Sequence, residues 1–495
     1  MVTNQTKNLH LFWRAGFGPA AEQIQQFSSA SSKDMYAALE KASKAKPAYI
    51  NVAKNIYDGL VMGVGSVVNM EQVRKELQDN DKKRQFQKRS RDAIKSLNLT
   101  WLEEMVTTNA QLREKMAFFW HGHFACRNLN IFFQQLLLDD IRNNALGNFK
   151  NLLTAVSKSA AMLAFLNNQQ NKKQSPNENF AREVMELFTM GRGNYTEKDI
   201  KEAARAFTGW SYDLNGEFLF RKFQHDSGSK TFLGKTGNFT GEDIIEILLE
   251  QKQTAHYITR KVYKFFVNEK VDEANVQWLS KRFYESGYDI PTLMRDVFTS
   301  KWFYDEQNIG TKIKSPIELI AGMRRLLPMK LENDEVQLLM QRTLGQMLFY
   351  PPNVAGWPGG TNWIDSSSLV LRMRIPQLVK DNEVFAITPK TDDDQQMGMK
   401  EEGRPGNNMR EQLQAKRQNE RFRINADVKW EDYTKQLKDV PREQLVNVIE
   451  SLVLQTKPGT MNSGAVEKMA DKTSRENYIQ SVTIALMSTP EYQLC

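Results

Sequence analysis

The chain has 495 residues, of which 40% are hydrophobic, 10% aromatic and 25% charged, with a formal net charge of +8. This composition is that of a globular protein with a large core, and it excludes an intrinsically disordered chain. Two cysteines exclude a disulfide-rich scaffold, and the mild positive charge permits anionic partners without requiring nucleic acid.

The first segments of the chain are polar. Met1 to Asn8 has no apolar run of the kind found in a secretory signal, so we expect a cytoplasmic protein. Residues 71–95 are rich in charged side chains and predict a long solvated helix. Its acids interleave with its bases, so we expect no specific nucleic-acid partner. No apolar run reaches the roughly 18 residues of a membrane-spanning helix, and we expect a soluble chain without a transmembrane segment.

Apolar residues then recur at helical spacing over most of the chain. Ser175-Pro176-Asn177-Glu178 and Ser315-Pro316-Ile317-Glu318 each have the pattern of a capping box with proline at the first helical position. Thr196 and Thr240 begin looser versions, with aspartate three residues on. The helices predicted by spacing cover residues 112–119, 180–190, 198–207, 244–249, 258–267, 276–283, 293–303, 446–454 and 478–487.

Two of the five histidines stand together in Phe119-Trp120-His121-Gly122-His123-Phe124. On a helix their side chains would point about 200° apart, whereas on an extended segment they would share one side. Imidazole is the commonest metal ligand, so His121 and His123 are candidates for a metal pair, or for a base with an orienting partner. The alternative is a structural histidine that bonds a backbone carbonyl within an aromatic core.

The predicted helix after Ser175 is dense in amides and carboxylates. Asn179, Glu183 and Glu186 fall on one face at spacings of four and three, as do the carboxylates that helix bundles direct at metals. Arg182 lies four residues after Glu178 and is positioned to pair with it. The alternative is a solvated face with ordinary ion pairs.

A small hairpin is predicted near residues 210–224, because Asn215-Gly216 is a strong type I′ turn signal between aromatic residues. The hairpin would deliver His225 and Asp226 to its far end, where an aspartate beside a histidine is a candidate to fix its tautomer. The alternative is a turn in which Asp226 bonds the backbone two residues on.

A rigid loop follows at residues 351–360, Pro-Pro-Asn-Val-Ala-Gly-Trp-Pro-Gly-Gly. We expect it either to wall a pocket with Trp357 and Trp363 or to connect packed helices. Residues 391–425 are polar and charge-dense, which predicts a flexible insertion or linker. The predicted organisation is therefore a main helical domain over residues 1–390 that carries the candidate site, and a C-terminal helical segment over 426–495 that packs back onto it. The fold class is mainly α, a multi-helix globular fold with one small hairpin.

Several of these motifs, in this order, resemble the bacterial family called domain of unknown function 1800. The resemblance runs from Leu9 to Tyr492 and implies that the recurring polar positions are functional, and that a sulfatase-like family is a partner. Many members have histidine where this chain has Phe188, which weighs against a strict metal site. The motifs are HLFWRAGFGP, FWHGHF, the run from PNENFAREV to AFTGW, HDSGSKTFLG, GYDI and PPNVAGWPGG.

The patterns favour an enzyme that uses a divalent metal ion, and hydrolysis rather than redox chemistry because no flavin, haem or thiolate motif is present. The competing hypothesis is a non-catalytic scaffold whose proline-glycine loop holds a glycan or a partner protein. The residues assigned to the site are His121, His123 and His225 as metal ligands, Glu183, Glu186 and Asp226 as catalytic groups, and Asn179, Arg182 and Trp357 as binding residues.

Overall fold

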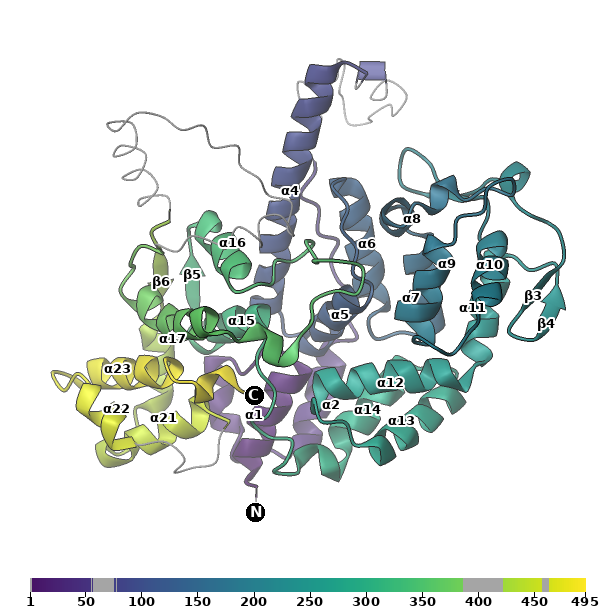
Figure 1. Ribbon diagram of the computed structural model, residues 1–495. Helices are drawn as coiled ribbons and strands as arrows, with labels where there is room; N and C mark the ends of the chain where they lie inside the picture. The colour runs from purple at the N-terminus through teal and green to yellow at the C-terminus, as the bar shows by residue number, and fades with distance from the viewer. Residues whose placement is uncertain (1, 55, 57–74, 77, 386–421, 456–462) are drawn as a thin grey trace.

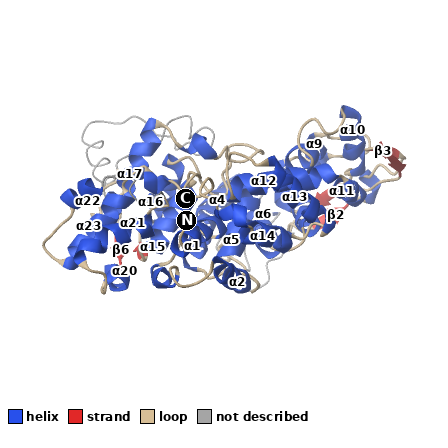
Figure 2. Cartoon of the chain, turned by 90° about the horizontal axis from the view of Figure 1, so that it is seen from below, coloured by secondary structure: helices blue, strands red, loops and turns tan. Residues whose placement is uncertain are grey.

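The computed structural model is mainly helical, which confirms the predicted fold class. The structure describes residues 2–54, 56, 75–76, 78–385, 422–455 and 463–495. Central helices carry one helical lobe on either side (Figure 1), and the molecule is elongated when it is seen from below (Figure 2). Within the described residues, no helix combines the length and apolarity needed to cross a membrane.

The central helices surround a buried N-terminal helix, α1, in which every residue from Asn8 to Ala15 is buried. Arg14 donates hydrogen bonds to the backbone oxygens of Val267 at 2.8 Å, Asn308 at 3.0 Å and Cys495 at 2.7 Å, so one side chain joins three distant segments. The central elements are α1 (Asn4–Ala15), η1 (Ala21–Gln26), α2 (Ser32–Ala42), α4 (Asn80–Thr107), α5 (Gln111–His123) and α6 (Ile131–Asn144).

The lobe at the right of Figure 1 follows directly in sequence and includes two small sheets. Its first helices are α7 (Phe149–Lys158), α8 (Ala160–Phe165), η2 (Asn168–Gln170), α9 (Asn179–Glu183), the π-helix η3 (Val184–Thr189) and α10 (Glu197–Ala206). Its strands are β1 (Trp210–Tyr212), β2 (Phe218–Phe220), β3 (Lys230–Phe232) and β4 (Lys235–Gly237), with η4 (Lys222–Gln224) between the pairs. Its last helices are α11 (Gly241–Glu250), α12 (Lys252–Phe266), α13 (Glu273–Glu285), α14 (Ile290–Thr299) and η5 (Lys301–Tyr304).

The opposite lobe joins segments on either side of residues 386–421. β5 (Met329–Leu331) pairs antiparallel with β6 (Ala426–Val428). Its helices before the gap are α15 (Pro316–Leu326), α16 (Asp334–Thr343), η6 (Gly360–Trp363) and α17 (Ser366–Lys380). Those after it are α20 (Trp430–Thr434), η7 (Lys435–Leu437), η8 (Arg442–Gln444), α21 (Leu445–Val453), α22 (Ser463–Met469), α23 (Arg475–Met487) and η9 (Glu491–Gln493).

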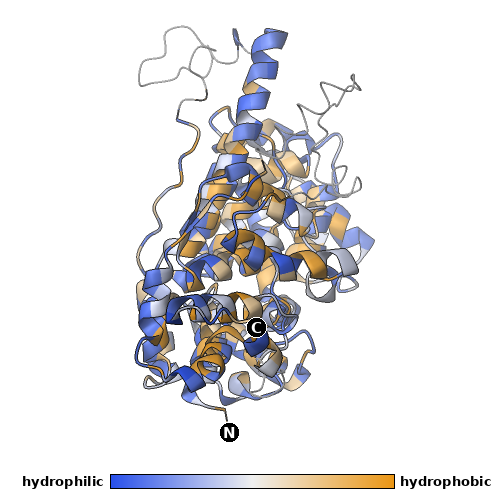
Figure 3. Ribbon diagram, turned by 90° about the vertical axis from the view of Figure 1, so that its left-hand side faces the viewer, coloured by the Kyte–Doolittle hydropathy of each residue, from blue (hydrophilic) through white to orange (hydrophobic). Residues whose placement is uncertain are grey.

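The predicted charged helix corresponds to α4, whose first turns project from the body and are hydrophilic (Figure 3). Residues 71–74 and 77 of that prediction lie outside the described residues, as do residues 391–421 of the predicted linker. The chain on either side of the latter stretch is nonetheless close, because the backbone N–H of Phe385 donates to the oxygen of Phe422 at 2.9 Å.

The capping predictions have different outcomes. The boxes at Ser315, Thr196 and Thr240 are confirmed, each with its side chain accepting from the third helical N–H. The box predicted at Ser175 is wrong, because α9 begins only at Asn179 and Ser175 instead pairs with Lys172 in an isolated bridge. The local reason is that the Asn177 side chain accepts from the N–H of Asn179, which holds the preceding turn out of the helix.

The predicted hairpin is confirmed as the β1–β2 pair, with Trp210 opposite Phe220 and Tyr212 opposite Phe218. Its turn type was predicted wrongly. A type I′ turn needs positive φ at both central residues, but only Gly216 has one, at +84°. Asp213 donates its N–H to the oxygen of Glu217 at 2.9 Å, so three residues form the loop. The sheets β3–β4 and β5–β6 were not predicted, because each strand has only three residues.

Gly322 in α15 permits close packing against the indole of Trp13, and a Cβ added there would lie 2.2 Å from the ring. Alanine normally stabilises a helix by about 1 kcal/mol relative to glycine. We expect Gly322→Ala instead to lower the free energy of unfolding by about 1–3 kcal/mol, because the core has no room for the methyl group. Urea denaturation measures this. Gly122→Ala on α5 is the matched control, since its Cβ would meet nothing within 4 Å, and equal stability of the two variants would refute the packing argument.

Candidate functional site

The two histidines of the FWHGHF segment lie in the last turn of α5, which ends at His123. Because this segment is helical, the two imidazoles point to different surroundings rather than to one metal. Gly122 lies between them, and the space where its side chain would be is open. This opening forms part of a cavity of about 340 Å³ that is described below.

His121 has a structural environment. Its Nε2 accepts a hydrogen bond at 3.2 Å from the backbone N–H of Phe349, a non-glycine residue with φ of +67°. Its ring packs against the rings of Trp101, Phe349 and Trp357. Burial lowers the pKa of His121 to about 3, so the imidazole stays neutral at physiological pH. His121 therefore supports the strained turn that leads into the 351–360 loop.

His123 lies against the carboxylate helix and contacts an unexpected partner. Its Nε2 is 3.2 Å from the backbone oxygen of Phe188, to which only a protonated ring nitrogen donates. Its Nδ1 then has a free lone pair and lies 3.0 Å from Nζ of Lys261 on α12. Burial and the charge of Lys261 lower the pKa of His123 well below its ordinary value and outweigh the hydrogen bond to Phe188, which raises it. The imidazole is thus a neutral acceptor aimed at an amine.

The backbone of the carboxylate helix changes form at this contact. After α9 the chain continues as the π-helix from Val184 to Thr189, a rare element that is frequent at functional sites. The wider turn leaves backbone oxygens for other donors. The oxygen of Leu187 accepts from the Tyr257 hydroxyl at 3.2 Å and lies 3.5 Å from Nζ of Lys261. The π-helix therefore fixes both members of the His123–Lys261 pair.

Lys261 has no carboxylate partner among the residues that the structure describes. Burial lowers its pKa from the ordinary value to about 8. Nζ of Lys261 also lies over the face of the Tyr257 ring, whose centroid is 5.1 Å away. Burial also raises the pKa of Tyr257, to about 12, so that hydroxyl is neutral and supplies no countercharge. With this pKa, roughly a tenth of Lys261 is the free amine at pH 7 and about half at pH 8, and the free amine is both a base and a nucleophile.

The cavity of about 340 Å³ opens beside this pair, between the end of α5, α12 and the 351–360 loop. Trp357 and Trp363 line it, as the sequence suggested for a pocket wall, and the indole nitrogen of Trp357 is buried without a hydrogen-bond partner among the described residues. Its polar lining includes the side chains of Lys264 and Glu269. Gly360 has a φ of +59°, a conformation that favours glycine, and its backbone lies close to the Glu269 carboxylate.

Buried charges form the floor of the cavity. Glu318 is 1% exposed and accepts from Nζ of Lys115 at 2.5 Å and Nζ of Lys312 at 2.6 Å. Burial alone would raise the pKa of Glu318, but the two ammonium groups outweigh it and keep the pKa far below its ordinary range. Burial lowers the pKa of Lys115 to about 8, so most of Lys115 is protonated at pH 7. The triad links α5 to α15 and to the segment before it.

The predicted acidic residues Glu183 and Glu186 lie in the same helical segment as Phe188, whose backbone oxygen contacts His123, but their side chains make other contacts. Glu186 accepts from the Tyr195 hydroxyl at 3.0 Å and pairs with Arg192 at 3.3 Å. Glu183 is half-buried, and burial followed by the charge of Glu186 raises its pKa. In the described part of the chain, neither carboxylate hydrogen-bonds to a histidine.

The predicted binding residues of the same helix are occupied locally. Arg182 forms ion pairs with Glu178 at 3.2 Å and Glu197 at 2.9 Å. Asn179 donates its side-chain amide to the oxygen of Leu166 at 3.2 Å. These contacts tie α9 to its neighbours.

His225 and Asp226 lie at the end of the hairpin region, each with a local partner. Nδ1 of His225 is 3.0 Å from the backbone oxygen of Thr208, and its ring packs on Phe220. Asp226 pairs with Arg205 at 2.7 Å and accepts from the N–H of Gly228, as the turn alternative expected. The hydrogen bond from Arg205 lowers the pKa of Asp226.

The donor chemistry does not fit one metal ion held by His121, His123 and His225. One nitrogen of each ring is bonded to a different stretch of backbone, and the second nitrogen of His123 faces an ammonium group. Across the described ranges, no three His, Cys, Asp or Glu side chains gather closely enough to hold a metal. The metal site remains a prediction from the sequence.

Sequence reasoning missed Lys261, Lys312 and the buried role of Glu318. Lys261 lies in an amphipathic helix with ordinary lysines nearby, and no spacing distinguishes it. Glu318 was visible only as the last residue of a capping box, and it does accept from the N–H of Ser315 at 2.8 Å. A carboxylate can fill both roles, but only the fold shows the two lysines beside it.

Comparisons with known proteins give one match. A family model described as a protein of unknown function, DUF1800, matches residues 10–494. No curated protein matches the chain, and no solved structure matches it.

Proposed function

We propose that this chain, which belongs to the DUF1800 family, is an enzyme in which Lys261 acts as the reactive amine. The substrate is a small molecule that enters the 340 Å³ cavity with a flat face against Trp357 and presents a carbonyl group to Lys261. The observation that carries the proposal is the buried, carboxylate-free Nζ of Lys261 at 3.0 Å from the acceptor Nδ1 of His123.

The chemistry follows from the protonation state of the pair. A neutral lysine amine attacks a carbonyl carbon and, with loss of water, forms an imine, or it removes a proton next to a carbonyl. An ammonium group does neither. His123 orients the amine by accepting a hydrogen bond from it at Nδ1. The oxygen of Phe188 holds the other ring nitrogen, so that Nδ1 stays turned toward Lys261. His123 is thus a positioning residue for Lys261.

The cavity supports recognition of the rest of such a molecule. Its volume lies near the lower end of the range of about 300–1,000 Å³ for small-molecule sites. Lys264 and Lys312 on its lining favour a substrate that also carries a negative charge. The metal-assisted hydrolysis favoured by the sequence has no ligand cluster to support it in the described residues, so the amine replaces the metal in this proposal.

The second candidate is binding of a glycan without turnover, which the two tryptophans of the lining favour. Such a site gains nothing from a neutral amine. The two functions therefore differ in the reactivity of Lys261.

Reductive trapping with 4-formylbenzoate tests the enzyme proposal, because this probe has an aldehyde, a ring and a carboxylate. In the presence of cyanoborohydride at pH 7.5, we expect peptide mass spectrometry to find the secondary amine mainly on Lys261. Gly122→Leu, which fills the opening beside the pair, should reduce the adduct at least tenfold while the protein stays folded. Adducts spread evenly over exposed lysines such as Lys281 would contradict the proposal.

A further inference from the structure

A second cavity, of about 570 Å³, lies at the opposite end of α5 from His123. It is bounded by α2, the start of α5, the end of α6 and the start of α14, together with the segment that follows α2. Five cationic side chains line this cavity, whereas Glu40 is its only acidic lining residue. The cationic residues are Lys44, Lys46, Arg113, Arg142 and Arg295.

Two buried arginines hold the segment after α2 in place. Arg113 donates to the backbone oxygen of Ala45 at 2.5 Å, and Arg142 donates to that of Ala48 at 2.7 Å. Both arginines also bond Glu114, which is 0% exposed, and form ion pairs with Glu104, so two carboxylates balance their two charges. The anchored backbone oxygens fix the path of the segment that carries Lys44 and Lys46.

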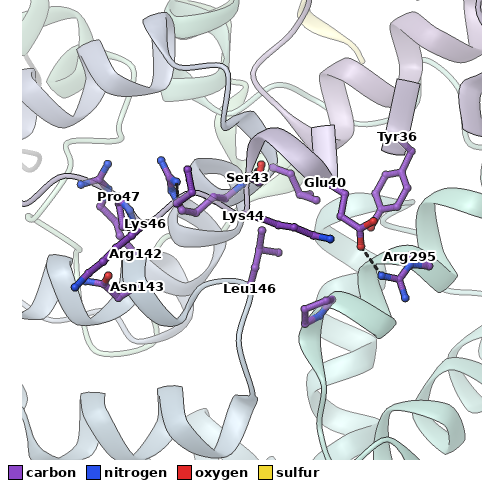
Figure 4. A pocket seen from close by; sticks show the side chains of 14 residues that line it. Tyr36, Glu40, Ser43, Lys44, Lys46, Pro47, Arg142, Asn143, Leu146 and Arg295 are labelled. Carbon is purple, nitrogen blue, oxygen red and sulfur yellow. Dashed lines mark hydrogen bonds and ion pairs between the residues drawn. The ribbon is translucent and has the colours of Figure 1, made fainter. Parts of the chain in front are cut away.

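The side-chain ammonium groups of Lys44 and Lys46 have no hydrogen-bond or ion-pair partner among the residues described. Figure 4 shows Lys44 extending between Leu146 and the ion pair that Arg295 forms with Glu40 at 2.5 Å. Lys46 lies with Arg142 at the other side of the cavity (Figure 4). Two ammonium groups without a direct ion pair, on a fixed backbone at a concave surface, create a field that attracts a negatively charged ligand, and Lys46 also interacts electrostatically with Asp139.

Tyr36 supplies an independent observation. Its side chain is 2% exposed and lines the cavity, yet its hydroxyl has no hydrogen-bond partner among the described residues. A buried hydroxyl without a partner destabilises the fold, and a ligand oxygen would satisfy it. Burial, with the nearby Glu40, raises the pKa of Tyr36, so the hydroxyl keeps its proton and remains a donor.

We propose that this cavity binds the phosphate group of a small phosphorylated molecule. Several cations and a hydroxyl donor around one hollow match the multiple acceptor oxygens of a phosphate better than the two of a carboxylate. The volume suits a small molecule, since it lies within the range of about 300–1,000 Å³ for ligand sites. The site is separate from the Lys261 cavity and does not depend on the function proposed for it.

Calorimetric titration of the full chain with pyrophosphate tests this site. We expect saturable binding to the wild type, an affinity at least tenfold weaker in the double variant Lys44→Gln/Lys46→Gln, and an affinity a few-fold weaker in Tyr36→Phe. Lys281→Gln/Lys330→Gln is the matched control, because it removes the same charge from two lysines whose side chains are each 75% exposed on other surfaces.

Three results would overturn the proposal. The first is absence of pyrophosphate binding to the wild type, and the second is an equal loss of affinity in the control double variant, which would show a non-specific charge effect. The third is sedimentation with vesicles that carry phosphatidylinositol 4-phosphate, lost in Lys44→Gln/Lys46→Gln and not competed by pyrophosphate. That result would assign the lysines to a lipid surface instead of a small molecule.

Discussion

Glu318→Gln is expected to lower the free energy of unfolding by about 3–5 kcal/mol, because it leaves two buried ammonium groups without their countercharge. The amide occupies nearly the same volume as the carboxylate, so the effect isolates charge from packing. Lys115 is 0% exposed in its side chain and Lys312 is 9% exposed, and neither reaches another carboxylate in the described residues. Urea denaturation at pH 7, followed by circular dichroism, measures the change.

Glu285→Gln is the matched control for this variant. Glu285 is 59% exposed and pairs with Lys281 at 3.8 Å on the surface of α13. Surface pairs of this kind contribute about 0–1 kcal/mol, so the control should unfold almost as the wild type does. A Glu318→Gln protein as stable as Glu285→Gln would show that the triad is not a buried charged unit.

Lys261→Met is expected to remove the 4-formylbenzoate adduct almost completely, whereas Lys264→Met should retain it. Both residues are on α12 and both line the cavity, but only Lys261 is bonded to His123. Peptide mass spectrometry of the two variants compares them directly. Retention of the adduct on a neighbouring lysine in Lys261→Met would show that the probe follows accessibility rather than the chemistry of one amine.

Lys261→Met is also expected to change how stability depends on pH. The folded lysine releases its proton near pH 8, whereas the unfolded one keeps it to about pH 10.4, so the unfolded chain binds more protons between these values. The free energy of unfolding of the wild type therefore gains a contribution that rises with pH across this window, by roughly 3 kcal/mol in total. The variant lacks that contribution. Parallel stability curves of the two proteins between pH 8 and pH 10 would contradict a lowered pKa.

Much of the local structure was readable from the sequence because short-range chemistry determines it. The helical periodicity, three of the capping boxes and the hairpin at Asn215-Gly216 all depend on neighbours within a few residues. The error at Ser175 has the same local scale, since the Asn177 side chain accepts from the N–H of Asn179 and holds the preceding turn out of the helix. The run from Trp120 to His123 at the end of α5 was also singled out in the sequence, and Gly122 and His123 line a cavity.

The site itself depends on contacts between distant segments, which no spacing encodes. His123 and Lys261 are 138 residues apart, and Lys115 and Glu318 are 203 apart. The π-helix that presents the oxygens of Leu187 and Phe188 has no sequence signal that distinguishes it from an α-helix. The sequence singled out His121, His123 and His225 as metal ligands, whereas their polar contacts in the structure include backbone atoms and, for His123, a lysine.

The protonation of Lys261 tests the central claim most directly. Competitive acetylation of the full-length protein between pH 6 and pH 11, with the extent of modification of each lysine read by peptide mass spectrometry, gives an apparent pKa for each amine. We expect a midpoint near pH 8 for Lys261, at which about half of it is neutral, well below the value of about 10.4 that is ordinary for lysine. A midpoint for Lys261 that coincides with those of the exposed lysines would contradict the account.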